Sequence, residues 1–441
     1  MTSGAGTVAG SLAPGLELFL GGDLPVGIRF WDDSTLGGPS DATLVLRSPR
    51  ALRYLLWAPG ELGLARAYVA GEIDLEGDIY TALSLRARLA APADRRPRRL
   101  SRAEAAGLLR TLVSAGALGL PPTPPEEEAR LRGVRHSRER DAAAIAHHYD
   151  ISNDFYRLVL GETMTYSCAF FPTASTTLDE AQRAKYDLIC RKLGLAEGMR
   201  LLDVGCGWGG MVLHAAAHYG VRAVGVTLSR RQLEAARARV ADAGLDDRIE
   251  IRLQDYRDIS DGPYDAISSI GMFEHVGLTH LAQYFRGLRA LLRDGGRLLN
   301  HGISRPDTNG GHARFVRRSF IDRYVFPDGE LHEVGAVISV MQGCRLEVRD
   351  VESLREHYAR TLRHWVENLE RNWDACAALV GTGRARVWRL YMAASALNFA
   401  ANRTSIHQVL AVRSAPDGAS AMPATREELL AGVPARSGTP R

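Results

Sequence analysis

Apolar runs and amphipathic stretches alternate along the chain from about residue 185 onward. Short apolar runs predict strands at 200–204, 222–227, 249–253, 265–270 and 296–303. Helical periodicity is found between them, at 209–219, 229–243 and 278–292. The same patterns predict a strand near 345–351, helices near 353–372 and 384–401, and a last strand at 408–413. This strand–helix rhythm predicts an α/β fold with a doubly wound parallel sheet.

The first part of the chain has shorter alternating runs, such as 27–31 and 43–46, and then a helical pattern at 61–70, which together predict a small α+β domain. Proline-containing segments at 95–99 and 121–125 are typical of linkers. We therefore expect an N-terminal accessory domain (1–120), a linker with a leading helix (121–145), a main domain (146–413) and a flexible tail (414–441). A long insertion at 304–340 is expected to form a lid at the strand ends.

Composition excludes several classes of protein. The chain has 441 residues, 46% of them hydrophobic, which is ample for a sizeable core, and its formal net charge is only +4. Lys185 and Lys192 are the only lysines, and so small a net charge predicts no nucleic-acid surface. Five cysteines without a CxxC pair argue against a disulfide framework or a metal site. Without a signal-like N-terminus or a long apolar run, we expect a cytoplasmic protein that at most lies on a membrane.

The sequence LLDVGCGWGG at 201–210 is the strongest indication of a binding site. An apolar strand ends near Asp203, and glycines then crowd the turn before a helix, where the backbone can approach a ligand closely. Gly205, Gly207 and Gly210 satisfy the dinucleotide pattern GxGxxG, but the second strand ends at Thr227 without the expected ribose-binding acid. The string DVGCGWG instead resembles the first motif of S-adenosylmethionine-dependent methyltransferases. We therefore favour a methyltransferase over a dehydrogenase.

Several further motifs appear in order around this loop. They are HYDISN at 148–153, MTYSC at 164–168, SIGMFEH at 269–275 and FPDGE at 326–330. Together they resemble the cyclopropane-fatty-acid synthase family, which includes the mycolic acid cyclopropane synthases, over about residues 135 to 413. The N-terminal region is similar to the extra, lipid- or dimer-associated domain of the phospholipid-acting members. RHSR at 135–138 and the segment 402–412 are similar to the actinobacterial branch that makes 10-methyl acids such as tuberculostearic acid.

This resemblance implies a class I methyltransferase that transfers the methyl group of S-adenosylmethionine to a cis double bond of a phospholipid acyl chain. An alkene is a weak nucleophile, so the donor must be held in line and water must be excluded from the resulting carbocation. Loss of a proton to bound bicarbonate then gives a cyclopropane or a methylene branch. A separate reductase is an expected partner in the second case. The resemblance further implies a peripheral location at the inner membrane face and leaves a homodimer open.

The resemblance also implies roles for single residues. Bicarbonate would be held by Cys168, Glu274, His301, Ile303 and Tyr358, the cysteine and isoleucine through their backbone. The methyl donor would be held at its carboxylate by Tyr166 and Ser167, by the loop with Asp203, Gly205, Gly207 and Gly209, at the ribose by Thr227, Leu228 and Gln232, and at adenine by Asp255 and Tyr256. For Tyr256, core packing is an equal alternative to adenine stacking. Ser395 stands where family descriptions place a cysteine, which puts a thiol nucleophile in doubt.

Some alternatives stay open at this point. The segment 315–326, with Arg314, Arg317, Arg318 and Arg323, and the apolar helix 391–399 could form an acyl tunnel with arginines near the phosphate, or be ordinary core and solvated charge. A methyltransferase acting on a small molecule is the second functional hypothesis, because the glycine loop is shared across the superfamily. A binder without activity would need a broken site, yet Glu274, His301 and Tyr358 are all present. The sequence does not separate a ring product from a branched one.

Overall fold

The computed structural model describes residues 7–13, 24, 26–38, 40–89, 102–129, 138, 140, 151–306, 319–326 and 329–431. The chain divides into two compact units, and each is described by itself. The first unit is made of residues 1–129, 318–325 and 381–394. The second unit is made of residues 130–317, 326–380 and 395–441, and it contains the predicted site residues.

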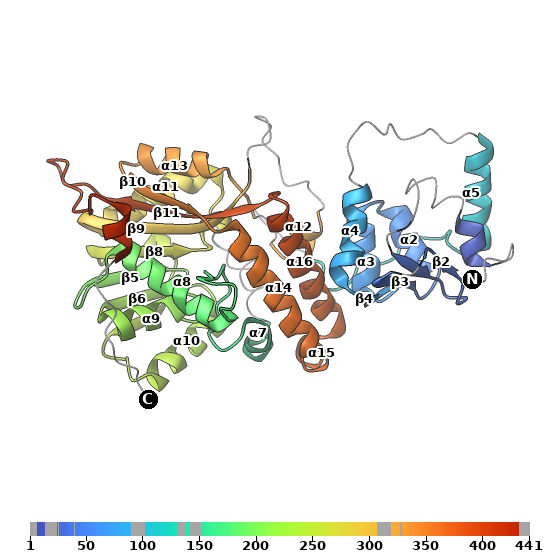
Figure 1. The fold of residues 1–441 in the computed structure, drawn as a ribbon, viewed down its shortest axis with the longest axis horizontal. Coiled ribbons are helices and arrows are strands. Elements are labelled where there is room, and N and C mark those ends of the chain that lie inside the picture. The colour runs from blue at the N-terminus through green and yellow to red at the C-terminus, as the bar shows by residue number, and fades with distance from the viewer. Residues whose placement is uncertain are drawn as a thin grey trace. The chain divides into compact units, whose positions relative to one another are not determined.

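A seven-stranded sheet with the order β10-β11-β9-β8-β5-β6-β7 forms the centre of the second unit (Figure 1). Its strands are β5 (Arg200–Val204), β6 (Arg222–Thr227), β7 (Ile249–Leu253), β8 (Tyr264–Ile270), β9 (Leu292–Ser304), β10 (Glu347–Ser353) and β11 (Ser405–Val412). The α/β doubly wound prediction is confirmed, but the expectation of an entirely parallel sheet is wrong. β11 runs antiparallel to both β9 and β10. A buried apolar run has the same pattern in either direction, so the sequence could not show this.

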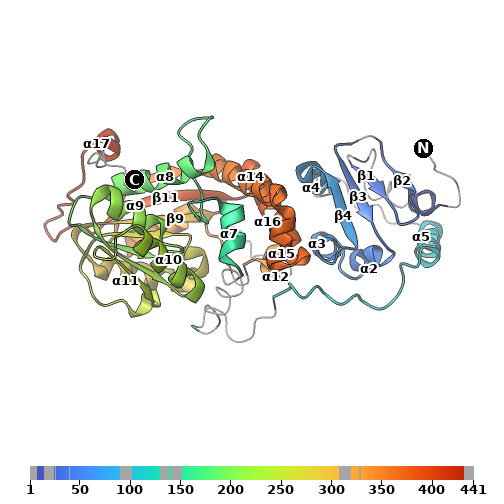
Figure 2. The same cartoon turned by 90° about the horizontal axis from the view of Figure 1, so that it is seen from below.

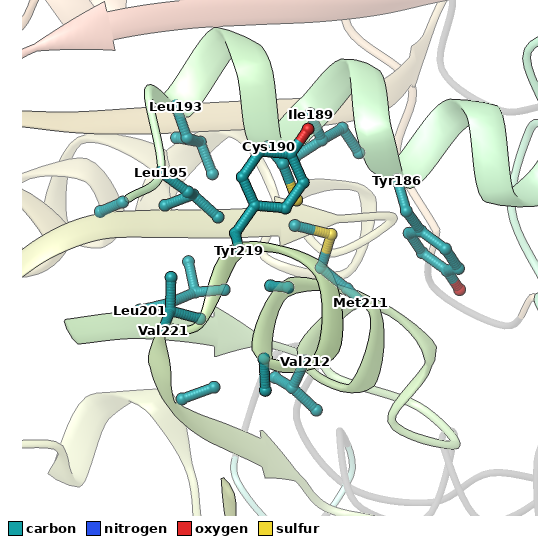
Figure 3. Packing of buried hydrophobic residues seen from close by; sticks show 14 of the residues in the cluster. Tyr186, Ile189, Cys190, Leu193, Leu195, Leu201, Met211, Val212, Tyr219 and Val221 are labelled. Atoms are coloured by element: carbon teal, nitrogen blue, oxygen red, sulfur yellow. The ribbon is translucent and has the colours of Figure 1, made fainter. Parts of the chain in front are cut away.

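Helices cover both faces of this sheet. They are α8 (Leu178–Leu193), α9 (Gly210–Tyr219), α10 (Arg230–Asp242), α11 (Leu278–Leu291) and α13 (Val334–Gly343). Figure 1 shows α11 and α13 on one side and α9 and α10 on the other. One apolar core packs α8, α9 and α10 against the sheet through Tyr186, Met211 and Leu233, and Figure 3 shows part of it. The other packs α11 and α13 through Phe285 and Met341. The helices therefore hold the strand ends rigidly in place.

The remaining elements of the second unit surround the carboxyl ends of the strands or follow the sheet. They are α7 (Asn153–Leu160), the 3₁₀ turns η1 (Tyr256–Asp258) and η2 (Phe273–His275), α14 (Arg355–Arg371), α15 (Trp373–Val380) and α17 (Arg426–Ala431). α16 (Thr382–Ala400) contributes residues to both units. α8 begins with a capping box in which Thr177 and Glu180 bind each other's backbone N–H groups. It ends at Gly194, whose left-handed conformation is the usual stop for a helix.

The first unit is a small α+β domain, as the pattern predicts. Its sheet has the order β2-β1-β3-β4, and Figure 2 shows its strands side by side with α2 and α3 against them. The elements are β1 (Gly27–Arg29), β2 (Thr35–Leu36), β3 (Ala42–Leu46), β4 (Ile73–Gly77), α2 (Arg50–Trp57), α3 (Glu61–Val69), α4 (Ile79–Leu89), α5 (Arg102–Ser114) and α12 (Phe320–Tyr324). Buried Glu128 accepts two hydrogen bonds from Arg66, at 2.9 and 2.8 Å, and one from Arg323. This ion-pair group attaches α12 to α3.

No helix within the described residues is long and apolar enough to cross a membrane. The same part of the chain contains no group of three or more histidine, cysteine or acidic side chains that could hold a metal ion.

Candidate active site

The glycine loop follows β5 at the point where the strand order reverses. β5 lies between β6 and β8, while the chain runs from β5 to β6 and β7 before it returns to β8. Such a switch point is where doubly wound folds bind their ligands. Gly205 has a φ of +79°, and a Cβ atom there would lie 2.4 Å from the sulfur of Met272. Its positive φ therefore favours glycine, and a larger residue would in addition displace the Met272 side chain.

Asp203 lies at the end of β5, directly before this loop. It is almost fully buried, and its Oδ1 accepts a hydrogen bond of 2.6 Å from the hydroxyl of Ser268 on the neighbouring strand β8. Burial raises the pKa of Asp203 to about 6. The carboxylate is thus fixed at the sheet edge beside the glycines, as expected for a cofactor ligand.

The end of β6 supplies the next group of predicted cofactor residues. The hydroxyl of Thr227 donates to Oε1 of Gln232 at 2.8 Å and accepts from the backbone N–H of Ser229 at 3.1 Å. Gln232 Nε2 lies 4.0 Å from the position that a Cβ atom on Gly207 would take. The structure therefore brings Thr227 and Gln232 next to the glycine loop, with Leu228 between them in the chain.

Asp255 and Tyr256 follow β7, at the predicted adenine end. Both carboxylate oxygens of Asp255 accept hydrogen bonds from the guanidinium of Arg257, at 2.8 and 2.6 Å. Burial acts to raise the pKa of Asp255, but these bonds lower it below its ordinary value. The ring of Tyr256 meets that of Tyr284 edge to face, 4.9 Å between centroids. Tyr256 thus packs in the core, which was one of its two expected roles. It also lies at the edge of the sheet where adenine stacking, the other expected role, would take place.

Tyr166 and Ser167 lie on a loop that three side chains of α8 hold by hydrogen bonds. Gln182 Nε2 donates to the carbonyl oxygens of Thr165 and Ser167, at 3.3 and 2.9 Å. Lys185 Nζ donates to the Ser167 hydroxyl at 3.1 Å, and Tyr186 shares a 2.8 Å hydrogen bond with the Thr165 hydroxyl. All three α8 side chains are buried, whereas Tyr166 and Ser167 are half-buried. The loop is thus held firmly by buried side chains, while Tyr166 and Ser167 keep part of their surface exposed.

Glu274 and His301 lie at the same end of the β8–β9 pair, since His301 pairs with Ile270 and Glu274 bonds to the backbone of Ile303, two residues further along β9. The backbone N–H of Ile303 donates to Oε1 of Glu274 at 2.6 Å, so Ile303 here positions the glutamate. Gln408 Nε2 lies 3.2 Å from Nδ1 of His301. Oε2 of Glu274 and Nε2 of His301 are buried and have no hydrogen-bond partner among the described residues. Two buried polar atoms at this end of the strands therefore remain for a ligand.

Burial determines the protonation of this pair. It raises the pKa of Glu274 to about 7, so the carboxyl is partly protonated at neutral pH. It lowers the pKa of His301 well below its ordinary value, so the imidazole is neutral. With the Gln408 amide donating to Nδ1, the ring hydrogen is assigned to Nε2. Both free atoms can then donate hydrogen bonds, which suits an anion.

Cys168 and Tyr358 are brought together by α14. The Cys168 thiol lies 3.6 Å from the carbonyl oxygen of Leu354, and the N–H of Ala169 donates to the Thr361 hydroxyl at 3.1 Å. Tyr358 lies on the same helix between these two contacts and is buried. Burial raises the pKa of the Cys168 thiol far above its ordinary value, so it stays a neutral thiol and not a nucleophile.

A row of aromatic side chains, missed from the sequence, runs through the site. Successive ring centroids lie 4.7 to 6.1 Å apart along Trp208, Tyr156, Tyr166, Trp365, Tyr358 and Phe399. The row connects the glycine loop with α14 and α16. Tyr358 and Trp365 are seven residues apart on one helix and so share a face, a spacing that could have indicated the row.

Some predicted residues are placed elsewhere or not described. Residues 148–150, Arg314, Arg317, Arg318, Pro327 and Asp328 lie outside the described residues. Arg323 belongs to the first unit, where its guanidinium lies 3.3 Å from Glu128. Ser395 is buried in α16. Arg323 is therefore bound to a carboxylate, and the proposed role of the other arginines stays a prediction.

Comparison with known proteins points to one family. The sequence model of the family described as mycolic acid cyclopropane synthetase matches residues 136–409. The probable fatty acid methyltransferase Rv3720 of Mycobacterium tuberculosis is 46% identical, over 94% of this chain and 97% of its own. Tuberculostearic acid methyltransferase UfaA1 of the same organism is 35% identical, over 89% of each chain. The crystal structure of the mycolic acid cyclopropane synthase CmaA1 with SAH and CTAB has a TM-score of 0.58 and 36% identity, over 61% of this chain and 97% of the other.

Fold and site together define a class I methyltransferase that uses S-adenosylmethionine. The chain belongs to the mycolic acid cyclopropane synthetase family. The turn after β5, in which Gly205, Gly207 and Gly209 all have positive φ, and the buried acid Asp203 fit the cofactor of this class.

Proposed function

We propose that the protein transfers the methyl group of S-adenosylmethionine to the cis double bond of an unsaturated acyl chain in a membrane phospholipid. The product would be a cyclopropane or a 10-methylene branch, and a reductase would convert the branch to 10-methyl. The names of the relatives support the acyl substrate, since they include fatty acid methyltransferases and a cyclopropane-fatty-acyl-phospholipid synthase of Escherichia coli.

The pair of buried, available polar atoms on Glu274 and His301 carries this proposal. Buried polar groups are nearly always hydrogen-bonded, so this pair is suited to a small polar ligand. Since both atoms can donate, bicarbonate fits better than a cation. Cys168 and Tyr358 lie together on the adjoining loop and helix, and the phenol of Tyr358 could add a hydrogen bond without adding charge.

When bound, S-adenosylmethionine supplies the methyl group and bicarbonate would accept the proton. The chain's own residues would bind, orient and exclude water. Neutral His301 and protonated Glu274 would hold the anion by donating to it, without competing for the substrate proton. Buried Trp365 and Phe399 keep water from the Tyr358 side of the site. No cysteine nucleophile is required, which agrees with a neutral Cys168 and with serine at position 395.

A small-molecule methyltransferase is the alternative. Transfer to an amine or a hydroxyl group removes a proton from nitrogen or oxygen, and this requires no special base for a carbon-bound proton. The buried Glu274–His301 pair would then have no evident purpose. This geometry favours the acyl substrate.

We further propose that the first unit contacts a phospholipid surface. Six of the ten large apolar side chains exposed among the described residues lie between residues 56 and 120, namely Leu56, Trp57, Leu109, Val113, Leu118 and Leu120. The indole N–H of Trp57 donates to the carbonyl oxygen of Gly119 at 3.0 Å, which places Trp57 beside Leu118 and Leu120. The Arg53 guanidinium also contacts this loop through Gly116. An amphipathic indole, exposed leucines and an arginine match the interface of an anionic bilayer.

The test is to incubate the enzyme with methyl-labelled S-adenosylmethionine and dioleoyl phospholipid vesicles and to identify the acyl product by mass spectrometry and NMR. We expect an acyl chain that has gained one labelled carbon. Activity should fall in bicarbonate-depleted buffer and return when bicarbonate is added. Unmodified acyl chains together with methylation of a small-molecule acceptor would overturn the proposal.

Glu274→Leu tests the site itself. Leucine removes both the acceptor for the Ile303 N–H and the carboxyl group that would donate to the anion, and we expect a loss of roughly 100-fold in turnover. Glu234→Leu, at an exposed position of α10, is the matched control and should keep full activity. Full activity in Glu274→Leu would contradict the assignment.

A further inference from the structure

Lys185 is a fully buried cation that the reaction described above does not use. It and Lys192 are the only lysines in a chain with 55 lysines and arginines together. Both lie on α8, and both side chains are completely buried. Lysine thus occurs only at two interior positions. In such a packed interior the compact ammonium group of lysine takes less space than the wide, planar guanidinium of arginine.

The two buried ammonium groups have very different surroundings. Lys192 Nζ forms ion pairs with Asp350 at 2.9 Å and Glu352 at 2.6 Å, so its charge is neutralised within the protein. Lys185 has no such ion pair among the described residues. Its Nζ donates to the Ser167 hydroxyl at 3.1 Å and lies 3.9 Å from the centroid of the Tyr186 ring. A buried charge is costly unless it is paired, so an anion from outside the chain is expected here.

Lys185 also fixes the direction of the Ser167 hydroxyl. The charged form of Lys185 can only donate hydrogen bonds, so Ser167 Oγ accepts from it. The hydroxyl hydrogen of Ser167 is then free to donate to another acceptor. Gln182 and Tyr186 hold the same loop through Thr165 and the Ser167 carbonyl, which keeps this arrangement rigid. Ser167 itself is half-buried, unlike the three α8 side chains that hold the loop.

We infer that Lys185 is a positioning residue that turns Ser167 into a hydrogen-bond donor for a carboxylate-type anion and balances the charge of that anion. The anion is the carboxylate of the methyl donor or bicarbonate, since both are planar oxyanions expected beside the 166–168 loop. Asp203 influences the pKa of Lys185 by its charge, but it is bonded to Ser268 and forms no ion pair with Lys185. Burial lowers the pKa of Lys185 to about 7, so binding of an anion would favour the charged form. The inference rests on the proposed position of the ligands at this loop.

The experiment compares the binding of two probes by calorimetry. S-adenosylhomocysteine has the amino-acid carboxylate, whereas 5′-methylthioadenosine has the same adenosine and sulfur without it. In Lys185→Met we expect S-adenosylhomocysteine to bind roughly 10- to 100-fold more weakly and methylthioadenosine to bind as before. Arg183→Met removes an exposed cation from the same helix and should change neither affinity.

Two further measurements separate positioning from a merely structural role. Ser167→Ala should show the same selective loss, and the double variant should lose little more than either single one, because both act through one hydrogen bond. Without ligand, Lys185→Met should melt at the wild-type temperature or above, since it removes an unpaired buried charge. Should Lys185→Met fail to fold, the Ser167→Ala affinities decide alone.

The outcomes also identify the anion. Selective loss of S-adenosylhomocysteine binding assigns the carboxylate of the methyl donor. Unchanged binding with a higher bicarbonate concentration for half-maximal activity assigns bicarbonate. Equal loss of both probes, or no change in probe binding or bicarbonate requirement, overturns the inference. Because probe binding needs no lipid, its failure is distinct from a failure of the proposed acyl product.

Discussion

At the scale of single residues, the site is defined by polar groups that are buried without full pairing. The position of Glu274 and His301 at one edge could be predicted from the sequence, because strand ends of a parallel sheet meet there and the motifs mark those ends. Lys185 could not be predicted as part of the site. On the sequence a lysine in an amphipathic helix is typical of a solvated face, and only the packed loop at 165–168 shows that its ammonium is enclosed.

The raised pKa of Glu274 predicts a pH dependence of stability. The folded carboxyl keeps its proton to about pH 7, while the unfolded one loses it near 4.5, so stability falls as pH rises through this range and not above it. The difference amounts to roughly 3 kcal/mol at most. Glu274→Gln has no carboxyl group at this position, so the difference in free energy of unfolding between the variant and the wild type should shift in favour of the variant between about pH 5 and pH 8. Urea unfolding of both proteins at several pH values measures this difference. A difference that does not change with pH would contradict the raised pKa of Glu274.

At the scale of elements, the apolar pattern predicted most strands and helices to within a few residues, as for α14 and β5, because burial imposes the period of each element. It missed the short helix α15 and the antiparallel direction of β11. Both depend on packing between distant segments. The close contact between β9 and η2, which carries Glu274, is a further case. A Cβ atom on Gly302 would lie 1.9 Å from the ring of Phe273.

Gly302→Ala should therefore displace η2 and Glu274 with it. We expect a loss of roughly 1–3 kcal/mol in stability from overpacking, together with lower turnover. Phe273→Leu in the same chain should restore part of both, because it shortens the side chain that is struck. Gly287→Ala, where nothing lies within 4 Å in α11, should be neutral or slightly stabilising. Thermal melting and product assays of the wild type, Gly302→Ala, Phe273→Leu and the double variant give the cycle; equal losses without rescue would show that Phe273 is not the obstacle.

At the scale of the whole molecule, the linear pattern and the packed structure divide the chain differently. The sequence suggests successive domains, whereas the first compact unit also takes residues 318–325 and 381–394 from the later part of the chain. Ion pairs explain this: Glu128 binds Arg323, and Arg386 binds Asp74 of β4 and the carbonyl oxygen of Tyr68. Such pairings between distant residues leave no local pattern. The expected linker boundaries near residues 120 and 145 therefore stay predictions, because a division into successive segments cannot describe a unit built from distant ones.

The proposed membrane surface is tested on the complete protein, since activity toward a bilayer needs docking as well as chemistry. Trp57→Ser combined with Leu120→Ser removes two exposed apolar groups, and we expect several-fold weaker sedimentation with vesicles that contain anionic phospholipid. Binding of S-adenosylhomocysteine should be unchanged, because neither residue belongs to the cofactor site. Leu379→Ser, at another exposed position in α15, is the matched control and should sediment like the wild type. If the double variant still binds vesicles fully, the membrane contact lies on another surface.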